Sequence, residues 1–194
     1  MQDLITTTPP QVETRPLANR LIAAFFGVAA AGWGASAILT AIHFWVLPIP
    51  DGIDPQGPIA VLTSPWAYVG PLPLALIGAL YYIGMMTAAA LWITTKNPLL
   101  ERLLLPVTAS GVAFSAYFVY LQLVPIGEIC PFCMISAAAT TTLFALEVAV
   151  KRLGGAATAP AVNPAIAWPV MVAVPPLVTL AAMYTLTVLP LPGS

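Results

Sequence analysis

Residues 120–136 read YLQLVPIGEICPFCMIS, and this stretch joins two apolar segments through a short turn. Its centre is Cys130-Pro131-Phe132-Cys133, which contains both cysteines of the chain. Because proline suits the first position of a helix, we expect a helix to start at Pro131 with Cys130 as its N-cap. A thiol at that place faces unpaired amide groups and the positive end of the helix dipole, and both favour the thiolate.

Two cysteines at this spacing on a helix start are typical of a dithiol that closes into a strained, reducible disulfide. The other interpretations are two inert buried thiols or a static disulfide. Two cysteines are too few for a structural zinc site, so we expect no metal. The local context favours the redox pair.

The chain on either side of this stretch is strongly apolar. It has 194 residues, of which 60% are hydrophobic and 7% charged, whereas a soluble domain carries about 25% charged residues. Crossing about 30 Å of hydrocarbon takes roughly 20 apolar residues. Five segments meet this requirement, at residues 21–47, 72–94, 103–124, 131–150 and 165–189. The sequence therefore predicts an all-α integral membrane protein with five transmembrane helices.

The basic residues indicate the orientation in the membrane. With five spans, all six fall on one side: Arg15, Arg20, Lys96, Arg102, Lys151 and Arg152. The positive-inside rule then places the N-terminus in the cytoplasm and the C-terminus outside. Residues 1–20 are predicted to be a cytoplasmic tail, and residues 48–70 a long non-helical outer loop. The cysteine pair would face the oxidising side of a bacterial inner membrane or a thylakoid.

Charge and motif content exclude several classes of function. A net charge of −1 provides no basic footprint for nucleic acid. The chain has no pair of histidines for haem and no phosphate-binding glycine loop, so no haem, flavin or nucleotide is expected. A transporter is disfavoured because no ionisable residue is expected at mid-membrane and no inverted repeat is visible. A lipid-soluble quinone is the natural small partner for a dithiol at the outer face.

The stretch 120–136, together with VLTSPWA at 61–67 and PLALIG at 73–78, resembles the catalytic segments of the vitamin K epoxide reductase family. The resemblance runs over residues 21–150 and implies a four-helix bundle that holds a quinone, with the fifth helix and a short stub in 151–194. It implies that Cys133 faces the quinone and that Cys130 exchanges disulfides with a thioredoxin-like partner. The quinone would be of the menaquinone, ubiquinone or plastoquinone type. The implied quinone contacts are Ser64, Trp66, Phe132 and Ala137, although Trp66 is equally suited to anchor the membrane interface.

The sequence also departs from this family. Members usually carry two further cysteines in the first outer loop, but residues 48–70 contain none, and Pro58 stands where the second is expected. Gly70-Pro71 replaces the usual Phe-Gly, and no thioredoxin-like domain is expected. Two hypotheses remain. The chain is either a thiol:quinone oxidoreductase, or a catalytically altered accessory subunit that stabilises a larger membrane complex.

Several polar residues have both a functional and an ordinary interpretation. His43 either relays a proton to the quinone or hydrogen-bonds at the interface, and the second is favoured. Glu128 either raises the pKa of Cys130 or takes its proton, unless it is a solvated loop charge. Gln122 is a polar group in an apolar helix and is expected to find a partner within the bundle.

Other side chains are expected to have structural roles only. Glu147 and Lys151 are four residues apart and are predicted to form an exposed ion pair. Aromatic residues on the second and third segments are expected to pack or to sit at the membrane interface, namely Tyr81, Tyr82, Tyr117, Phe118 and Tyr120.

Overall fold

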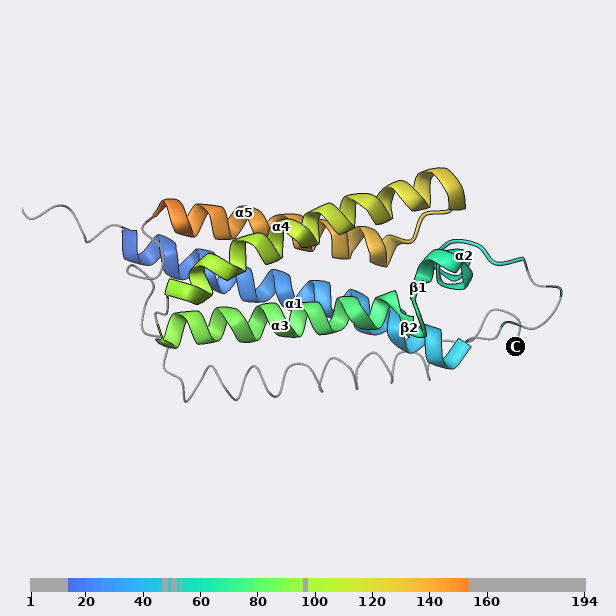
Figure 1. The fold of residues 1–194 in the computed structure, drawn as a ribbon, viewed down its shortest axis with the longest axis horizontal. Helices are drawn as coiled ribbons and strands as arrows, with labels where there is room; N and C mark the ends of the chain where they lie inside the picture. Colours follow the sequence, from blue (N-terminus) through green and yellow to red (C-terminus); the bar gives the residue numbers. More distant parts are fainter. Residues whose placement is uncertain (1–13, 47–48, 50–51, 53, 96–97, 154–194) are drawn as a thin grey trace, which may run out of the picture.

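The computed structural model describes residues 14–46, 49, 52, 54–95 and 98–153. Within this part of the chain, four long helices run side by side along the molecule (Figure 1). They are α1 (Thr14–Val46), α3 (Leu74–Thr95), α4 (Pro98–Leu121) and α5 (Pro131–Arg152). Apolar spans long enough to cross a membrane lie at Arg20–Trp45, Leu74–Thr95, Arg102–Ile126 and Pro131–Arg152. These four spans support the prediction of an integral membrane protein.

Several helix boundaries differ from the predictions, and α4 starts at Pro98 instead of residue 103. α1 begins at Thr14, inside the segment 1–20 that was predicted to be a tail. α4 passes into a π-helical turn, Gln122–Ile126, and the chain then turns at Gly127, which has a φ of 74°. A left-handed φ is readily adopted by glycine because it lacks a Cβ atom. The fifth predicted helix, at 165–189, lies outside the described residues.

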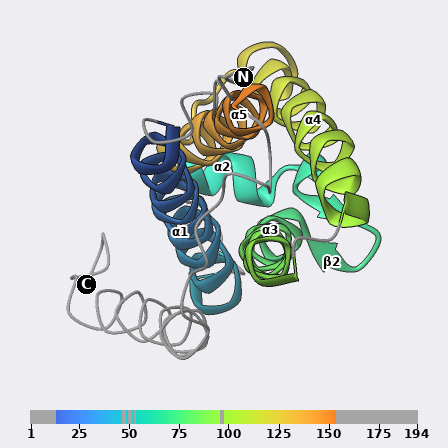
Figure 2. The same ribbon diagram turned by 90° about the vertical axis from the view of Figure 1, so that its left-hand side faces the viewer.

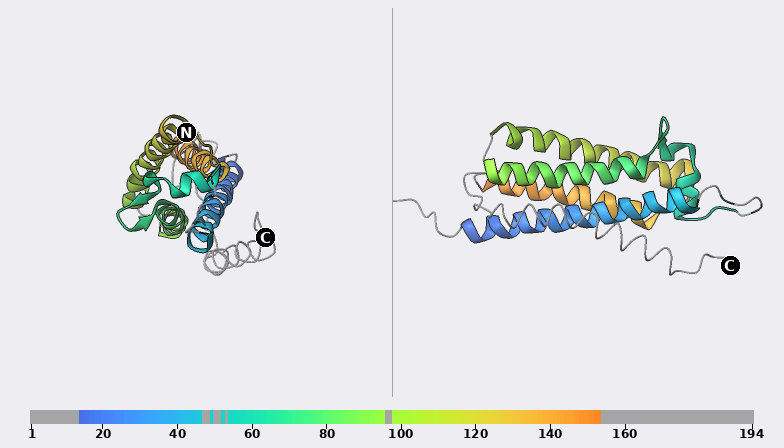
Figure 3. Two further views of the ribbon diagram at one scale, coloured as in Figure 1. Left: turned by 90° about the vertical axis from the view of Figure 1, so that its right-hand side faces the viewer. Right: turned by 90° about the horizontal axis from the view of Figure 1, so that it is seen from below.

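The prediction of a non-helical loop at 48–70 is wrong for its second half. Residues Pro58–Thr63 form the short helix α2, and Pro65–Ala67 form a 3₁₀ turn. Strands β1 (Tyr68–Val69) and β2 (Leu72–Pro73) then pair antiparallel. Pro58 occupies the first turn of α2, where its missing N–H and fixed φ suit a helix start. α2 lies across one end of the bundle (Figure 3).

The helices surround a common interior. α1 packs against both α3 and α5, and α4 packs mainly against α5. Viewed from the end, the four long helices are arranged around one axis, and α2 lies across it (Figure 2). The main core is built from α1, α3, α4 and α5 and includes the buried residues Ala29, Trp33, Tyr82 and Leu143.

Tyr82 links three helices at the centre of this core. Its hydroxyl donates to the backbone carbonyl of Ser136 at 2.7 Å and lies 2.8 Å from the Thr140 hydroxyl. Thr140 is buried, in agreement with the general use of small and polar residues where membrane helices pack closely. On the α1 side, a Cβ atom at Gly32 would collide with the Tyr82 ring. The bundle therefore needs a glycine at position 32 to seat this tyrosine.

The predicted ion pair between Glu147 and Lys151 forms, but the prediction that it is exposed is wrong for Glu147. Glu147 is only 5% exposed, and the Thr108 hydroxyl of α4 donates to its carboxylate at 2.7 Å. The Lys151 Nζ atom lies 4.0 Å from the same carboxyl group. The side chain of Glu147 is thus part of the contact between α4 and α5 near the end of the bundle opposite α2.

Gly32→Ala is expected to destabilise the fold, because the added methyl group must displace the buried Tyr82 ring. Overpacking of this kind costs about 1–3 kcal/mol. Gly27→Ala, on an open face of the same helix, is the control and is expected to cost nothing. Thermal unfolding in detergent, followed by circular dichroism, measures both variants. Equal midpoints for the two would contradict the close packing of Tyr82 on Gly32.

Candidate functional site

The two cysteines begin α5 as predicted. Pro131 stands at the first helical position and Cys130 is the N-cap. The Cys133 N–H donates to the Cys130 sulfur at 3.4 Å, so the thiol itself caps the helix. Both cysteines are free, and they come within 2.9 Å of each other. This geometry brings the two sulfurs together for disulfide formation with little movement of the backbone.

The surroundings of Cys130 favour its thiolate. The Cys133 thiol donates to the Cys130 sulfur and is the largest cause that lowers the pKa of Cys130, to about 7. The backbone N–H groups of Cys133 and Phe132 act in the same direction, while burial opposes them. Thiolate is the reactive form of cysteine, so Cys130 is poised to react near neutral pH.

Cys130 is nevertheless completely buried, with 0% of its surface exposed. Leu39 of α1 and Leu62 of α2 pack in the same buried cluster, and Phe132 lies against that cluster. A partner thiol that approaches from outside the bundle therefore meets α2 before it meets the sulfur.

A hydrogen bond fixes the start of α2 in this position. The Gly57 N–H donates to the Glu128 carboxylate at 3.0 Å, across 71 positions of sequence. Gly57 is the N-cap of α2 and has a φ of 57°, a conformation suited to glycine. Glu128 lies two residues before Cys130, in the turn that leads into α5. Its hydrogen bond therefore ties this turn to α2, the helix that covers Cys130.

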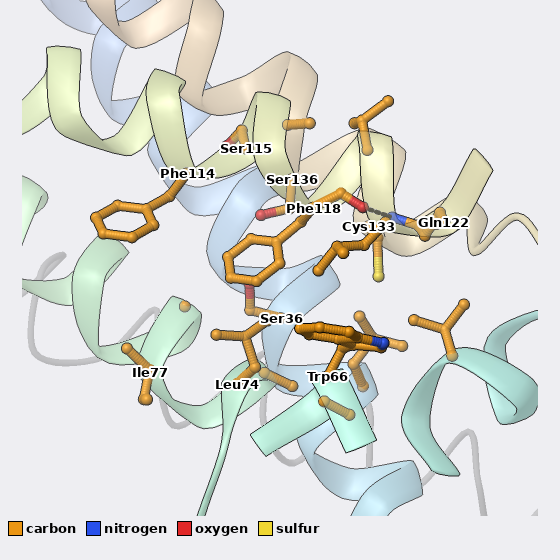
Figure 4. A pocket seen from close by; sticks show the side chains of 18 of the residues that line it. Ser36, Trp66, Leu74, Ile77, Phe114, Ser115, Phe118, Gln122, Cys133 and Ser136 are labelled. Carbon is orange, nitrogen blue, oxygen red and sulfur yellow. Dashed lines mark hydrogen bonds between the residues drawn. The ribbon is translucent and has the colours of Figure 1, made fainter. Parts of the chain in front are cut away.

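A cavity of about 430 Å³ lies beside Cys133. Its lining is mostly apolar and comes from all four long helices, from α2 and from the 3₁₀ turn. Figure 4 shows the Cys133 sulfur pointing into the cavity, with the Trp66 indole facing it from the opposite side. Ser64 and Ala137 also line the cavity. Ligand pockets commonly have volumes of about 300–1,000 Å³, so the space suits a small apolar ligand.

The cavity reaches the outer surface of the bundle between α3 and α4. Leu74 and Ile77 of α3 line it from one side, and Phe114 and Phe118 of α4 from the other (Figure 4). The two phenylalanine rings are stacked with centroids 6.4 Å apart. Phe114 is 62% exposed although it lines the cavity, so this wall borders the region that lipid would occupy.

The structure separates the predicted site residues into two groups. Cys133, Ser64, Trp66 and Ala137 meet at the cavity. Cys130 belongs to the buried cluster of Leu39 and Leu62, and Phe132 packs against that cluster, but neither Cys130 nor Phe132 is among the described lining residues.

The other candidates have mixed outcomes. Gln122 has partners within the bundle, as expected. Glu128 is bonded to Gly57 rather than solvated. His43 contacts the rings of Phe44 and Tyr68, and its buried Nδ1 atom has no hydrogen-bond partner among the described residues.

Sequence reasoning missed part of the cavity wall. Tyr81, Tyr82 and Phe118 were expected only to pack or to sit at the interface, but all three line the cavity. Tyr117 and Tyr120 are exposed, in agreement with an interface role. The signal available was a run of aromatic residues near helical spacing, which does not reveal which face of the helix borders a cavity.

The family model of the vitamin K epoxide reductase family matches residues 23–148, which is well over half of the chain. The chain belongs to the vitamin K epoxide reductase family. A search of curated proteins finds no match to it. Membership in this family supports an oxidoreductase-type function in the membrane, with a link to quinones and, in general terms, to a thiol partner. This vitamin K epoxide reductase family member has no cysteine in residues 48–70, and Pro58 begins α2 there.

The alkylation rate of Cys130 is expected to rise with pH through a midpoint near 7, because only the thiolate reacts. Cys133→Ala removes the thiol donor that contributes most to the low pKa, so its midpoint should move upward by about one pH unit or more. Cys133→Ser keeps a donor hydroxyl and is the matched control. Iodoacetamide labelling, followed by mass spectrometry, gives the profiles. Coincident profiles for the Ala and Ser variants would refute this origin of the low pKa.

Proposed function

We propose that this protein is a membrane thiol:quinone oxidoreductase. It passes electrons from an exported thioredoxin-like partner, through Cys130 and Cys133, to a quinone of the menaquinone, ubiquinone or plastoquinone type. The observation that carries the proposal is the position of Cys133. Its sulfur faces an apolar cavity while it also contacts Cys130, whose pKa is lowered to about 7.

The two cysteines have different chemical roles in this proposal. A partner thiolate attacks the Cys130 sulfur of the oxidised pair, which breaks the bond to Cys133 and forms a mixed disulfide. The second partner thiol then attacks the bridging partner sulfur and releases Cys130. The partner becomes a disulfide, and the cysteine pair gains two electrons and two protons. A thiol of low pKa leaves faster, so the environment of Cys130 suits its release.

The cavity residues fit a quinone head group. The space is apolar and large enough, and Ser64, Trp66 and Ala137 border it together with the Cys133 sulfur. When bound there, a quinone supplies the acceptor for two electrons and two protons from the reduced pair. The wall between Ile77 and Phe114 borders the lipid region, so an apolar tail can extend there without crossing the polar surface.

The absence of cysteine from residues 48–70 bears on how the partner reaches the pair. Because that segment has no cysteine that could relay electrons, the partner must exchange with Cys130 directly. Cys130 is buried beneath α2, so this exchange requires α2 to move away from the Glu128 side of the site. We place the α2 end of the bundle on the exported side, because Arg20, Arg102 and Arg152 belong to the opposite ends of the helices.

The full-length protein, purified gently from its native membrane, is expected to cycle its thiols. A dithiol of the thioredoxin-like class should reduce the pair, and an added short-chain quinone should reoxidise it, as measured by thiol trapping and quinol absorbance. Cys130→Ser and Cys133→Ser should each abolish turnover. When the partner is supplied in its disulfide form instead, only Cys133→Ser should form a mixed disulfide, because its Cys130 thiolate attacks the partner disulfide and releases one partner thiol. Ser110→Ala, exposed on α4, is the control.

Thiols that never cycle would refute the oxidoreductase. If such a protein also migrates within a large assembly, and Cys130→Ser leaves that assembly intact, the accessory-subunit hypothesis holds instead.

Filling the cavity is expected to weaken quinone binding without affecting the pair. Ala137→Leu introduces a bulky side chain at the cavity wall, and such overpacking should raise the KM for quinone about tenfold or more. Ala138→Leu, at the next position of α5 but on its exposed face, is the matched control. Exchange with the thiol partner should be equal in both variants. A larger effect from Ala138→Leu would place the quinone elsewhere.

A further inference from the structure

Gln122 is a buried polar side chain within the apolar span Arg102–Ile126. It is 2% exposed and begins the π-helical turn that follows α4. Polar side chains within membrane spans are costly to bury, and π-helical turns occur frequently at functional sites. Gln122 also lines the cavity that contains the Cys133 sulfur (Figure 4).

The carboxamide of Gln122 reaches across to the start of the neighbouring helix. Its Oε1 atom accepts the backbone N–H of Cys130 at 2.8 Å. Its Nε2 atom donates to the carbonyl of Phe118, one turn back on α4, at 3.3 Å. Gln122 therefore ties the backbone of the N-cap cysteine to the rigid end of α4.

This hydrogen bond controls the geometry on which the thiol of Cys130 depends. Cys130 has the extended conformation of an N-cap, with φ −97° and ψ 110°, and in this conformation its sulfur accepts the Cys133 N–H. The chain reaches Cys130 through Gly127, a residue with little conformational restriction. Without the bond from Gln122, the N–H of Cys130 would be buried with no acceptor, and this cost favours another backbone conformation.

Among the described residues, we identify two titratable groups beside Cys130. The titratable neighbours are Cys133, which donates to its sulfur, and Glu128, whose carboxylate accepts from Gly57. The apolar side chains of α1, α2 and α3 that pack around the pair are Leu39, Ile42, Val61, Leu62 and Ala75. Hydrogen bonding within the N-cap is therefore the main support that the thiolate has.

We infer that Gln122 is a positioning residue for the redox pair: its carboxamide oxygen holds the Cys130 backbone in the N-cap conformation that directs the Cys130 sulfur toward Cys133. The consequence for turnover rests on the proposed function, whereas the effect on Cys130 itself does not. Gln122 acts through Cys130 and takes no part in electron transfer.

Gln122→Met tests this role, since it keeps the length of the side chain and removes the acceptor. The pH midpoint for iodoacetamide labelling of Cys130 should rise, and labelling at pH 7 should slow by about tenfold as the thiolate fraction falls. Gln122→Glu keeps an oxygen acceptor for the Cys130 N–H, and its carboxyl group should stay neutral in apolar surroundings. It should therefore restore most of the labelling rate. Ser110→Ala, on the exposed face of α4, is the control.

The assay uses the full-length reduced protein in detergent and contains neither quinone nor partner, so it is independent of the proposed function. Wild-type protein that fails to reduce quinone would refute the oxidoreductase and leave this inference intact. An unchanged pH midpoint in a folded Gln122→Met variant would overturn the inference. If that variant does not fold, Gln122→Glu decides, and a midpoint raised by more than one pH unit in Gln122→Glu would overturn the inference.

Discussion

The hydrogen bonds of the Tyr82 hydroxyl hold α5 in the position that the rest of the bundle and the site require. This hydroxyl donates to the Ser136 carbonyl, one turn after Cys133, and Gly32 on α1 leaves room for the ring. The contact fixes the depth and rotation of α5 relative to α1 and α3. It thereby determines that Cys133 faces the cavity while Cys130 turns toward α1 and α2. A substitution at Tyr82 would shift α5 and so change the position of the two cysteines, although the tyrosine contacts neither sulfur.

The cover over Cys130 has a different physical origin. α2 is only six residues long, and a helix of that length is marginal by itself. It persists through burial of Leu62 and through the bond between the Gly57 N–H and Glu128. These two contacts can break without disturbing the main core, because that core is built from the long helices. The chain thus combines a rigid cavity with a cover that has a low local stability.

Local signals and tertiary contacts differ in how well the sequence reveals them. The start of α5 at Pro131 was predictable because capping depends on residues adjacent in sequence. The four described spans followed from hydropathy. The bond from Gly57 to Glu128 was not predictable, because it joins residues 71 positions apart. Burial of Glu147 was missed because its spacing to Lys151 fits a surface pair equally well. Gln122 did give a signal, since an amide within an apolar helix needs a partner.

The low pKa of Cys130 raises its reactivity, and burial beneath α2 lowers that reactivity by a factor of similar size. Lowering its pKa to about 7 raises the thiolate fraction at neutral pH from a few per cent to about half, roughly tenfold or more. A hydrogen bond to a charged group, like that between Gly57 and Glu128, contributes about 1.5–3 kcal/mol, which corresponds to about ten- to hundredfold in the open fraction of α2. A small disulfide or alkylating reagent that cannot displace α2 therefore gains little from the low pKa. A protein partner that displaces α2 gains access to the oxidised pair, and the low pKa then speeds the departure of Cys130 from the mixed disulfide, so selectivity resides in the cover rather than in the sulfur.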